Sequence, residues 1–423
     1  KCGKKPDVLA ANLAAFKAGY NFGETTEMIA TSYVVKPAET APGLYRNISG
    51  ATALAWGLVA AADRANLHLF YASYPITPAS ELLHELSRLK NFGVRTLQAE
   101  DEIAAANVAL GAAFAGDLAV TGTSGPGLDL KAETLGLANI MELPMVIVDV
   151  MRAGPSTGMP TRTQQSDVVL CAYASHGDTK HVLLFPEDPT ECFEFSATSL
   201  DLANRLQTPV FVMTDLDIGM NTRLCEPFRW DDSREYDRGK LMTAEELEAG
   251  KEFGRYLDVD GDGIPFRTLP GTHPTKGSYF TRGTTKDRYA RYSEQGTDYV
   301  DNMRRLLRKF ESAKEMVPQP VVRRARQKTR IGAIYYGSTS PSMTEAMDVL
   351  DEQGVMLDAM RVRAFPFSEA VVEFVAEHDQ VFVIEQNRDA QLRSLLVNEL
   401  NVDPAKMQSH AARRPRQPAV TRA

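Results

Sequence analysis

The sequence predicts an α/β protein built on a mainly parallel sheet. Short runs rich in β-branched and aromatic residues recur between residues 68 and 215, and stretches with helical spacing of apolar residues separate most of them. The runs are apolar throughout rather than alternating, which is typical of strands covered by helices on both faces. With 423 residues, of which 43% are hydrophobic and 24% charged, the chain is long enough for two or three domains.

The expected elements follow one another in four segments. Residues 1–42 are predicted to form a helical segment and a Pro-containing linker. The first α/β domain, residues 43–225, has expected strands at 68–74, 94–98, 118–123, 145–150, 181–185 and 209–215 and helices at 81–89, 103–115 and 128–142. Residues 226–328 are charged and turn-rich, which predicts a loop-dominated insertion ending in one long amphipathic helix before Pro318. A smaller α/β domain, residues 329–423, has expected strands at 331–337, 355–362 and 380–386 and a basic tail that includes Arg413, Arg414, Arg416 and Arg422.

Charge and cysteine usage exclude several classes of function. The net charge of −8 argues against nonspecific binding to nucleic acid or to acidic membrane surfaces. The four cysteines stand far apart, so we expect no zinc or iron–sulfur cluster in this chain, and no apolar run approaches the ~20 residues of a membrane span. We expect a reducing, cytoplasmic location. The first residue is Lys, and we expect the sequence to start inside a longer chain.

In parallel α/β sheets, ligands bind beyond the carboxyl ends of the strands, so the loops there are where a site is expected. The first loop is "YPITP", residues 74–78. Thr77 is expected to cap the following helix, with Pro78 at its first position, and the Thr77 hydroxyl would keep its own proton to donate outward. Pro75 would present a rigid apolar surface beside it.

Two further loops lead into helices. Glu100, Asp101 and Glu102 precede an alanine-rich helix, and the helix dipole favours such acids. Glu100 stands at the strand end, where a buried carboxylate would have a raised pKa and could hydrogen-bond a protonated ring nitrogen of a ligand. In the next loop, Ser124 and Gly125 open a helix whose free N–H groups could hold an anion, although a tight packing turn is the favoured interpretation.

The loop after the strand at 145–150 carries cationic and hydroxyl side chains. Arg152 follows the strand, and Ser156, Thr157 and Arg162 come after it. An arginine at a strand end beside small hydroxyl residues suits bidentate capture of a carboxylate. A structural ion pair with a neighbouring acid is the alternative.

An acidic turn in the insertion has the spacing of a calcium loop. Asp258, Asp260 and Asp262 stand at the first, third and fifth positions, but the twelfth is Leu269 instead of the glutamate that such loops need. A turn without metal is the favoured interpretation, and a bound divalent ion is the alternative.

Several of these motifs together resemble those of one family. The segments "YPITP" (74–78), "TSGPGL" (123–128), "RAGPSTGMPTRTQQSD" (152–167), "FPF" (365–367) and "VFVIEQNRDAQLRSLL" (381–396) are similar, in the same order, to motifs of the α subunit of the 2-oxoacid:ferredoxin oxidoreductases. The resemblance extends from about Tyr45 to Leu400 and is greatest to the 2-oxoglutarate enzymes. Residues 1–42 resemble the tail of the γ domain that precedes α in fused members.

The resemblance implies a thiamine diphosphate enzyme. The first domain would bind the pyrimidine half of the cofactor, and the last would be a transketolase C-terminal-like domain. A β subunit would carry the diphosphate with its Mg²⁺ and a [4Fe–4S] cluster, in an α2β2 assembly that uses CoA and reduces ferredoxin. The implied reaction converts 2-oxoglutarate to succinyl-CoA and CO2, with pyruvate or branched-chain 2-oxoacids as alternative substrates. A noncatalytic α/β binding scaffold is the alternative from another class.

The resemblance also implies roles for single residues. Glu100 would bond the aminopyrimidine ring, Pro75 would lie against the cofactor, and Thr77 and Arg152 would meet the keto-acid end of the substrate. Ala153 stands where the family motif often has glycine. The remaining expected site residues are Ser124 and Gly125 for the cofactor and Ser156, Thr157 and Arg162 for the substrate.

Overall fold

The computed structural model describes residues 5–27, 34, 36–157 and 161–411. It divides into two compact units, Lys1–Leu44 and Tyr45–Ala423. The first unit contains the helix α1 (Pro6–Thr26), which has no buried residue, so the helix expected in this segment is present. The arginines of the predicted basic tail, from Arg413 onward, lie outside the described residues.

The second unit is built on a seven-stranded sheet in the order β12-β6-β7-β5-β4-β2-β3, in which only the β12–β6 pair is antiparallel. Its strands are β2 (Leu69–Ser73), β3 (Arg95–Gln98), β4 (Leu118–Thr123), β5 (Met145–Met151), β6 (Val182–Leu184), β7 (Pro209–Asp215) and β12 (Ala364–Phe365). Every residue of β4, β5 and β7 is buried, as expected for strands covered on both faces. The predicted parallel α/β fold is confirmed.

Helices connect these strands and cover the sheet. They are α2 (Gly50–Ala65), α3 (Ser80–Arg88), α4 (Glu102–Ala115), α5 (Gly125–Met141), α6 (Val168–Ala172), α7 (Pro189–Leu206) and α8 (Leu216–Met220), with the short 3-10 helix η1 (Lys90–Phe92). The helices α2 and α7 approach closely at Gly57, where an added Cβ would stand 2.2 Å from the carbonyl oxygen of Phe193. A side chain at position 57 would therefore force the two helices apart. A separate two-stranded sheet pairs β1 (Arg46–Ser49) with β8 (Thr222–Cys225).

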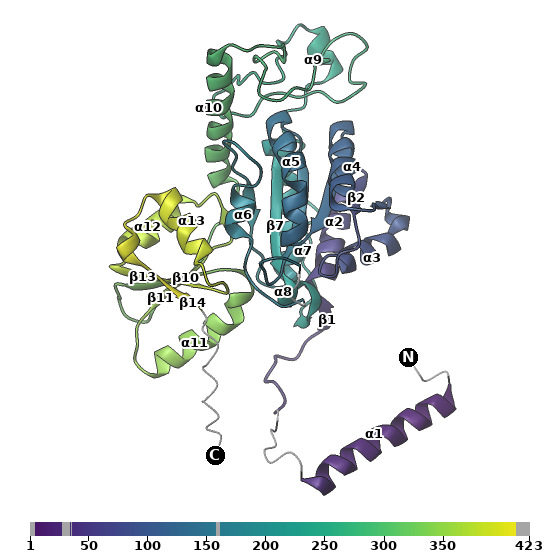
Figure 1. Cartoon of the computed structure of the whole chain (residues 1–423), viewed down its shortest axis with the longest axis vertical. Helices are drawn as coiled ribbons and strands as arrows, with labels where there is room; N and C mark the ends of the chain where they lie inside the picture. The colour runs from purple at the N-terminus through teal and green to yellow at the C-terminus, as the bar shows by residue number, and fades with distance from the viewer. Residues whose placement is uncertain (1–4, 28–33, 35, 158–160, 412–423) are drawn as a thin grey trace. The chain divides into compact units, whose positions relative to one another are not determined.

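The charged insertion contains little regular structure apart from its last helix. It includes α9 (Ala244–Glu248), then the predicted long helix α10 (Gly296–Ser312), followed by the 3-10 helix η2 (Ala313–Glu315). Figure 1 shows α9 and the loops around it beside the upper end of α10.

A second sheet of five strands follows, in the order β14-β13-β10-β11-β9, with β9 antiparallel to β11. Its strands are β9 (Val321–Arg323), β10 (Ile331–Tyr335), β11 (Asp358–Arg361), β13 (Gln380–Glu385) and β14 (Met407–Ala411). The helices α11 (Ser340–Glu352), α12 (Glu369–Glu377) and α13 (Gln391–Leu400) accompany it, with the 3-10 helices η3 (Gly337–Thr339) and η4 (Pro404–Lys406).

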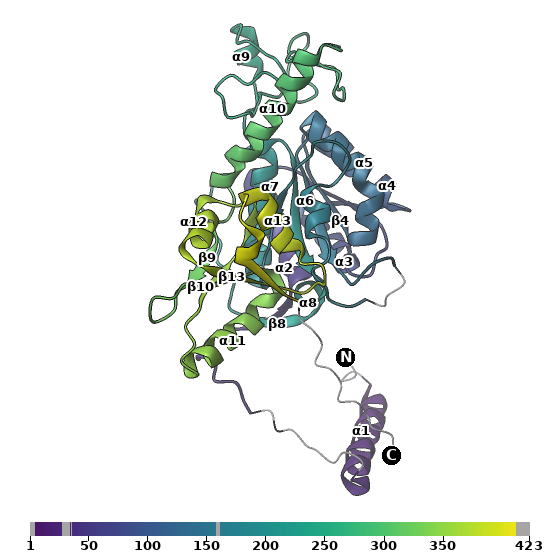
Figure 2. The same cartoon turned by 60° about the vertical axis from the view of Figure 1, so that its left-hand side comes forward.

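The two sheets share one hydrophobic core. A single cluster of buried residues includes Val148 of β5 and Val383 of β13. The strand β12, which carries the "FPF" segment, pairs with β6 and so belongs to the first sheet although it lies in sequence between β11 and α12. Figure 1 and Figure 2 both show α13 beside α6, a helix of the larger sheet's connections. None of the helices in the described part of the chain combines the length and apolar character needed to cross a membrane.

Candidate active site

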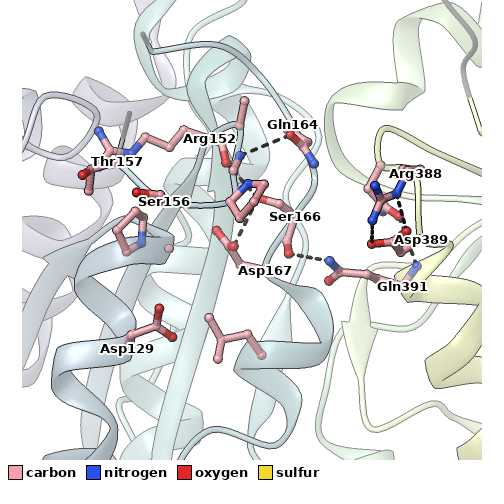
Figure 3. Close-up of a pocket in the computed structure, with 17 residues that line it drawn as sticks. Asp129, Arg152, Ser156, Thr157, Gln164, Ser166, Asp167, Arg388, Asp389 and Gln391 are labelled. Carbon is pink, nitrogen blue, oxygen red and sulfur yellow. Dashed lines mark hydrogen bonds and ion pairs between the residues drawn. The ribbon is translucent and has the colours of Figure 1, made fainter. Parts of the chain in front are cut away.

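A cavity of about 750 Å³ lies where the loops after β4 and β5 meet residues 387–391, which follow β13. Its walls come from the first turn of α5, the loop that begins at Arg152, the start of α6 and that C-terminal segment. Figure 3 shows Arg152, Ser156 and Thr157 on one side of the cavity and Arg388 and Asp389 on the other. A site at this edge of the sheet is what the parallel topology predicts.

Arg152 directly follows β5 and is only 9% exposed. Among the residues that the structure describes, its guanidinium forms no ion pair, and Figure 3 shows it extending along the loop past Thr157. The structural ion pair that was the alternative for Arg152 is therefore not found within the described part of the chain. A buried guanidinium without a carboxylate partner favours binding of a ligand carboxylate.

The other loop residues expected to bind substrate differ in position. Ser156 and Thr157 line the cavity and are exposed. Arg162 is exposed, does not line the cavity, and donates to the carbonyl of Thr161 at 2.9 Å. A backbone hydrogen bond of 2.8 Å from Ala153 N to Arg162 O holds the two ends of this loop together, and residues 158–160 lie outside the described part.

The first turn of α5 forms the floor of the cavity. The helix begins at Gly125, within the glycine-rich turn and three residues before the expected start at residue 128, and the buried Ser124 Oγ has no hydrogen-bond partner among the described residues. An added Cβ at Gly125 would stand 2.6 Å from Asp167 Oδ1, so no larger residue fits there. The carboxylate of Asp167 therefore already occupies the space beside this helix start, and the orphaned Ser124 hydroxyl can still meet a polar group of a ligand.

The "YPITP" loop is folded differently from the prediction. Thr77 does not cap α3, because the helix begins at Ser80 with Ala79 as its N-cap residue. The Ser80 hydroxyl instead donates to Ile76 O at 2.7 Å and accepts from Ile76 N at 3.1 Å, which stabilises a separate turn before the helix. The predictions of Thr77 as the cap and Pro78 as the first helical residue were therefore wrong. Pro75 and Thr77 are exposed at the surface of this loop.

Glu100 is also exposed, contrary to the burial expected for it. Asp101 caps α4 through a hydrogen bond of 2.8 Å from Ala104 N, so Glu100 precedes the cap and lies outside the helix. Glu102 is the half-buried acid of the three. Its Cγ would stand 3.0 Å from a Cβ added at Gly127, which places the Glu102 side chain against the first turn of α5.

Three buried polar groups near Glu102 were not expected from the sequence. Tyr74 OH and Thr123 Oγ1 lie 3.0 Å apart, and Lys131 Nζ donates to Glu102 O at 3.2 Å. Burial lowers the pKa of Lys131 to about 8, although the charge of Glu102 acts in the opposite direction. Lys131 stands at helical spacing between Leu128 and Leu135 on the buried face of α5, and this was the signal that could have revealed the group.

The acidic turn of the insertion is held by cations of the protein. The carboxylates of Asp258, Asp260 and Asp262 lie within 4.8 Å of one another. Lys240 Nζ bonds Asp260 Oδ1 at 2.7 Å and Asp262 Oδ1 at 2.8 Å, and Arg308 pairs with Asp258 at 3.1 Å. The Lys240 ammonium thus supplies positive charge within this turn.

The comparison with protein families decides the assignment. Residues 61–312, more than half of the chain, match the family described as pyruvate flavodoxin/ferredoxin oxidoreductase, thiamine diphosphate-binding. The chain belongs to this family. The resemblance predicted from the motifs is confirmed.

Individual members of this oxidoreductase family are similar over long segments. The 2-oxoglutarate oxidoreductase subunit KorA of Mycobacterium tuberculosis is 49% identical over 232 residues, which cover 55% of this chain and 35% of that protein. The 2-oxoglutarate synthase subunit KorA of Methanothermobacter thermautotrophicus is 32% identical over 80% of this chain and 87% of that protein. The chain spans about a third to somewhat more than half of the M. tuberculosis relative and of two Aeropyrum pernix 2-oxoacid:ferredoxin oxidoreductase α subunits.

A solved structure supports the same placement. The 2-oxoglutarate:ferredoxin oxidoreductase of Magnetococcus marinus, determined with 2-oxoglutarate, coenzyme A and succinyl-CoA bound, matches with a TM-score of 0.81 at 29% identity. The match covers 97% of this chain and 70% of that one.

Proposed function

We propose that this chain is the α part of an oxidoreductase that decarboxylates 2-oxoglutarate with CoA, forms succinyl-CoA and CO2, and reduces ferredoxin. The relatives named for 2-oxoglutarate and the M. marinus structure with its bound ligands support this substrate. Pyruvate and branched-chain 2-oxoacids are the alternative substrates.

The observation that carries the proposal is the buried side chain of Arg152, which directly follows the C-terminal end of β5. It lines a cavity large enough for a dicarboxylic acid and has no carboxylate partner in the described part of the chain. Ser156 and Thr157 offer hydroxyl groups on the same wall. Arg152 would hold the carboxylate of the 2-oxoacid, and these two residues would contribute further hydrogen bonds.

The residues around the first turn of α5 fit the pyrimidine half of thiamine diphosphate. The unpartnered Ser124 hydroxyl suits a polar group of a flat ring at this helix start, where Asp167 and Tyr74 pack closely against Gly125 and Gly127. Thiamine diphosphate, when bound, supplies the carbon nucleophile and the electron sink for decarboxylation. Pro75 and Thr77, both exposed, would meet it or the substrate from the neighbouring loop.

Either Glu100 or Glu102 could accept the hydrogen bond from the aminopyrimidine ring. The resemblance assigns it to Glu100, which is exposed, whereas Glu102 is half-buried against Gly127. A hydrogen bond donated to a carboxylate is stronger in surroundings of low polarity. We therefore propose Glu102 as the better placed of the two, with Glu100 as the alternative.

The proposed assembly contains a second subunit. A β subunit would hold the diphosphate with Mg²⁺ and a [4Fe–4S] cluster in an α2β2 heterotetramer of the cytoplasm. The net charge of −8 is consistent with a protein that uses neither nucleic acid nor a membrane as partner.

The test is turnover by the protein co-expressed with its β subunit. Reduction of a viologen with 2-oxoglutarate and CoA is expected to be faster than with pyruvate at equal concentration. Faster turnover of pyruvate would contradict the substrate, and an assembly without thiamine-dependent activity toward any 2-oxoacid would support the noncatalytic scaffold.

A further inference from the structure

Two buried carboxyl groups lie beside the cavity, one on β5 and one, which lines the cavity, just before α6. Asp149 lies on β5 and is 0% exposed, and Asp167 precedes α6 and is 7% exposed. The two carboxyls are near neighbours, and each alters the pKa of the other. Ionisation of both neighbouring carboxyls in a buried site is unfavourable, and a single proton held between them relieves the repulsion.

The other contacts of Asp149 and Asp167 leave one oxygen of each carboxyl without a hydrogen bond. Asp149 Oδ2 lies 3.8 Å from the thiol of Cys171, and Asp167 Oδ1 lies 3.1 Å from Ser166 Oγ. Asp149 Oδ1 and Asp167 Oδ2 are buried and have no hydrogen-bond partner among the described residues. A proton held by Asp149 and donated to Asp167 gives these oxygens the hydrogen bond that they otherwise lack.

Burial raises the pKa of both groups, and Asp149 is raised further by the charge of Asp167. The pKa of Asp167 comes to about 6, because the hydrogen bonds from Ser166 and Asp149 and the charge of Arg152 act against burial. The pKa of Asp149 is raised well above its usual value, so the proton of the pair is assigned to Asp149, and Asp167 is the member whose charge changes near pH 6. The other titratable or charged groups that face the pair are Asp129 of α5, Arg152 after β5, Cys171 of α6, Tyr74 after β2 and Tyr336 after β10.

Asp167 is linked to Arg152 by structure as well as by charge. Ser166 Oγ lies 2.8 Å from Arg152 O and 3.1 Å from Asp167 Oδ1, so one hydroxyl joins the main chain of the arginine to the carboxyl. No direct ion pair between Arg152 and Asp167 is formed in this structure, and both line the same cavity. The charge of Asp167 therefore acts on any anion held by Arg152.

We propose that Asp149 and Asp167 form a one-proton pair that positions Arg152, and that binding of a ligand carboxylate at Arg152 is coupled to uptake of a second proton by Asp167. The proton comes from solvent and neutralises Asp167, which otherwise repels the incoming carboxylate. This inference rests on the proposed role of Arg152 in carboxylate binding. Asp149 and Asp167 are positioning residues, since neither needs to touch the reacting atoms.

The coupling can be measured by calorimetry with glutarate, a dicarboxylate that lacks the keto group and cannot react. Binding to the assembled protein is measured in two buffers of different ionisation enthalpy, which gives the number of protons taken up. Uptake is expected to be greatest near pH 6 to 7 and to vanish at low pH, where Asp167 is already protonated. Glutarate binding without proton uptake across this range would overturn the inference.

Variants separate the two members of the pair. Asp167→Asn should abolish the uptake and make glutarate affinity at pH 7.5 roughly three- to tenfold higher, since a nearby negative charge is removed. Asp149→Asn imitates the protonated carboxyl and should keep uptake close to that of the wild type. Loss of uptake in Asp149→Asn, or its persistence in Asp167→Asn, would contradict the shared proton.

A control and a second readout complete the test. Asp129→Asn removes another acid of the same cavity that is outside the pair, and uptake should persist in it. The pH dependence of KM for 2-oxoglutarate should flatten in Asp167→Asn while kcat changes less. Normal proton uptake in a protein that turns over no 2-oxoacid would refute the proposed function alone, whereas turnover with no uptake would refute the pair alone.

Discussion

At the scale of single residues, Glu100, Asp101 and Glu102 at the start of α4 differ in burial although they are consecutive. This difference decides which of them can bind a ligand as a shielded carboxylate. Asp101 takes the cap, which leaves Glu100 on the solvent side and turns Glu102 toward α5. Only a carboxylate shielded from water can make a strong hydrogen bond to a neutral or protonated ring. The half-buried position of Glu102 beside Gly127 provides such shielding.

Replacement of each acid by glutamine tests this assignment. In the assembled protein, Glu102→Gln should lower thiamine-dependent 2-oxoacid oxidation by roughly a hundredfold or more, because proton transfer by a positioned carboxylate contributes about that much. Glu100→Gln is the matched control and should keep most of the activity. The reverse pattern in the viologen assay would return the role to Glu100.

Arg152 and Arg162, the two arginines of the loop after β5, can be compared by replacing each with alanine. Arg152→Ala should raise KM for 2-oxoglutarate by about ten- to a hundredfold, since a charge-assisted hydrogen bond to a carboxylate is lost from a buried site. Arg162→Ala removes an exposed guanidinium outside the cavity and should change KM much less. Steady-state kinetics would decide, and equal effects of the two changes would argue against a special role for Arg152.

The sequence predicted this site unevenly, for physical reasons. Arg152, Ser124 and Gly125 were placed correctly at strand and helix ends because strand periodicity and glycine-rich turns are local signals. The cap at Thr77 failed because a competing hydroxyl, that of Ser80, bonds both backbone groups of Ile76. The Asp149–Asp167 pair joins residues 18 positions apart, and only the folded chain brings them together.

Among the helices, α5 links the cavity to a buried ionic cluster at its other end. Its first turn forms the cavity floor, and its C-cap residue, Glu142, is fully buried. Arg305 of α10 pairs with Glu142 Oε1 at 2.5 Å, and Lys309 of α10 pairs with Oε2 at 2.6 Å. The Arg255 guanidinium donates to Glu142 O at 2.7 Å, which satisfies a carbonyl of the helix end. The charged insertion is thereby fixed to the helix that carries the site.

Removal of the Glu142 charge, which lies between the cations of this cluster, should lower the stability of the fold. Burial would raise the pKa of Glu142, but the charges of Arg305 and Lys309 outweigh it and hold the pKa well below its usual range. Glu142→Gln leaves these two cations without a counter-ion and should lower the free energy of unfolding by about 3–5 kcal/mol in urea denaturation. Glu133→Gln, an exposed change on the same helix, should cost little.

The lowered pKa of Glu142 also makes the stability of the protein depend on pH. A carboxyl whose pKa is depressed on folding contributes stability above its unfolded value, near 4.5, and loses it as pH falls toward the folded value. The difference in stability between wild type and Glu142→Gln should therefore be constant from neutral pH to about 5 and shrink below about 4.5. A difference that grows on acidification would contradict the ionic account.

For the whole molecule, the two sheets are joined more closely than four consecutive segments suggest. The sequence predicted both sheets because each has its own run of strands and helices. It did not predict that β12 crosses into the first sheet, because a two-residue strand has no periodicity. Nor did it reveal Gln165, a fully buried residue. Gln165 lies at the contact between the loop after β5 and the residues that follow β10 and β13, which we call the seam between the sheets.

Gln165 makes several hydrogen bonds across this seam. Its Nε2 donates to Tyr336 O at 3.0 Å, and its Oε1 accepts from Gln386 N at 3.0 Å and from Thr339 Oγ1 at 3.2 Å. Its main chain adds bonds from Gln165 N to Gln386 O and from Asn387 Nδ2 to Gln165 O. The next two residues, Ser166 and Asp167, line the cavity, so this seam also fixes one wall of the site.

Gln165→Leu should loosen the seam while keeping the volume of the side chain. The buried groups of Tyr336, Gln386 and Thr339 would lose their partner, at a cost of about 1–3 kcal/mol for each group left unsatisfied. We expect a lower unfolding midpoint, faster proteolysis between the two sheets and a rise in KM for 2-oxoglutarate, because Asp167 and Arg152 lose support. Gln353→Leu, at an exposed position, is the matched control and should leave all three unchanged. An unfolding midpoint equal to that of the control would show that β12 and the shared apolar core hold the sheets together without this residue.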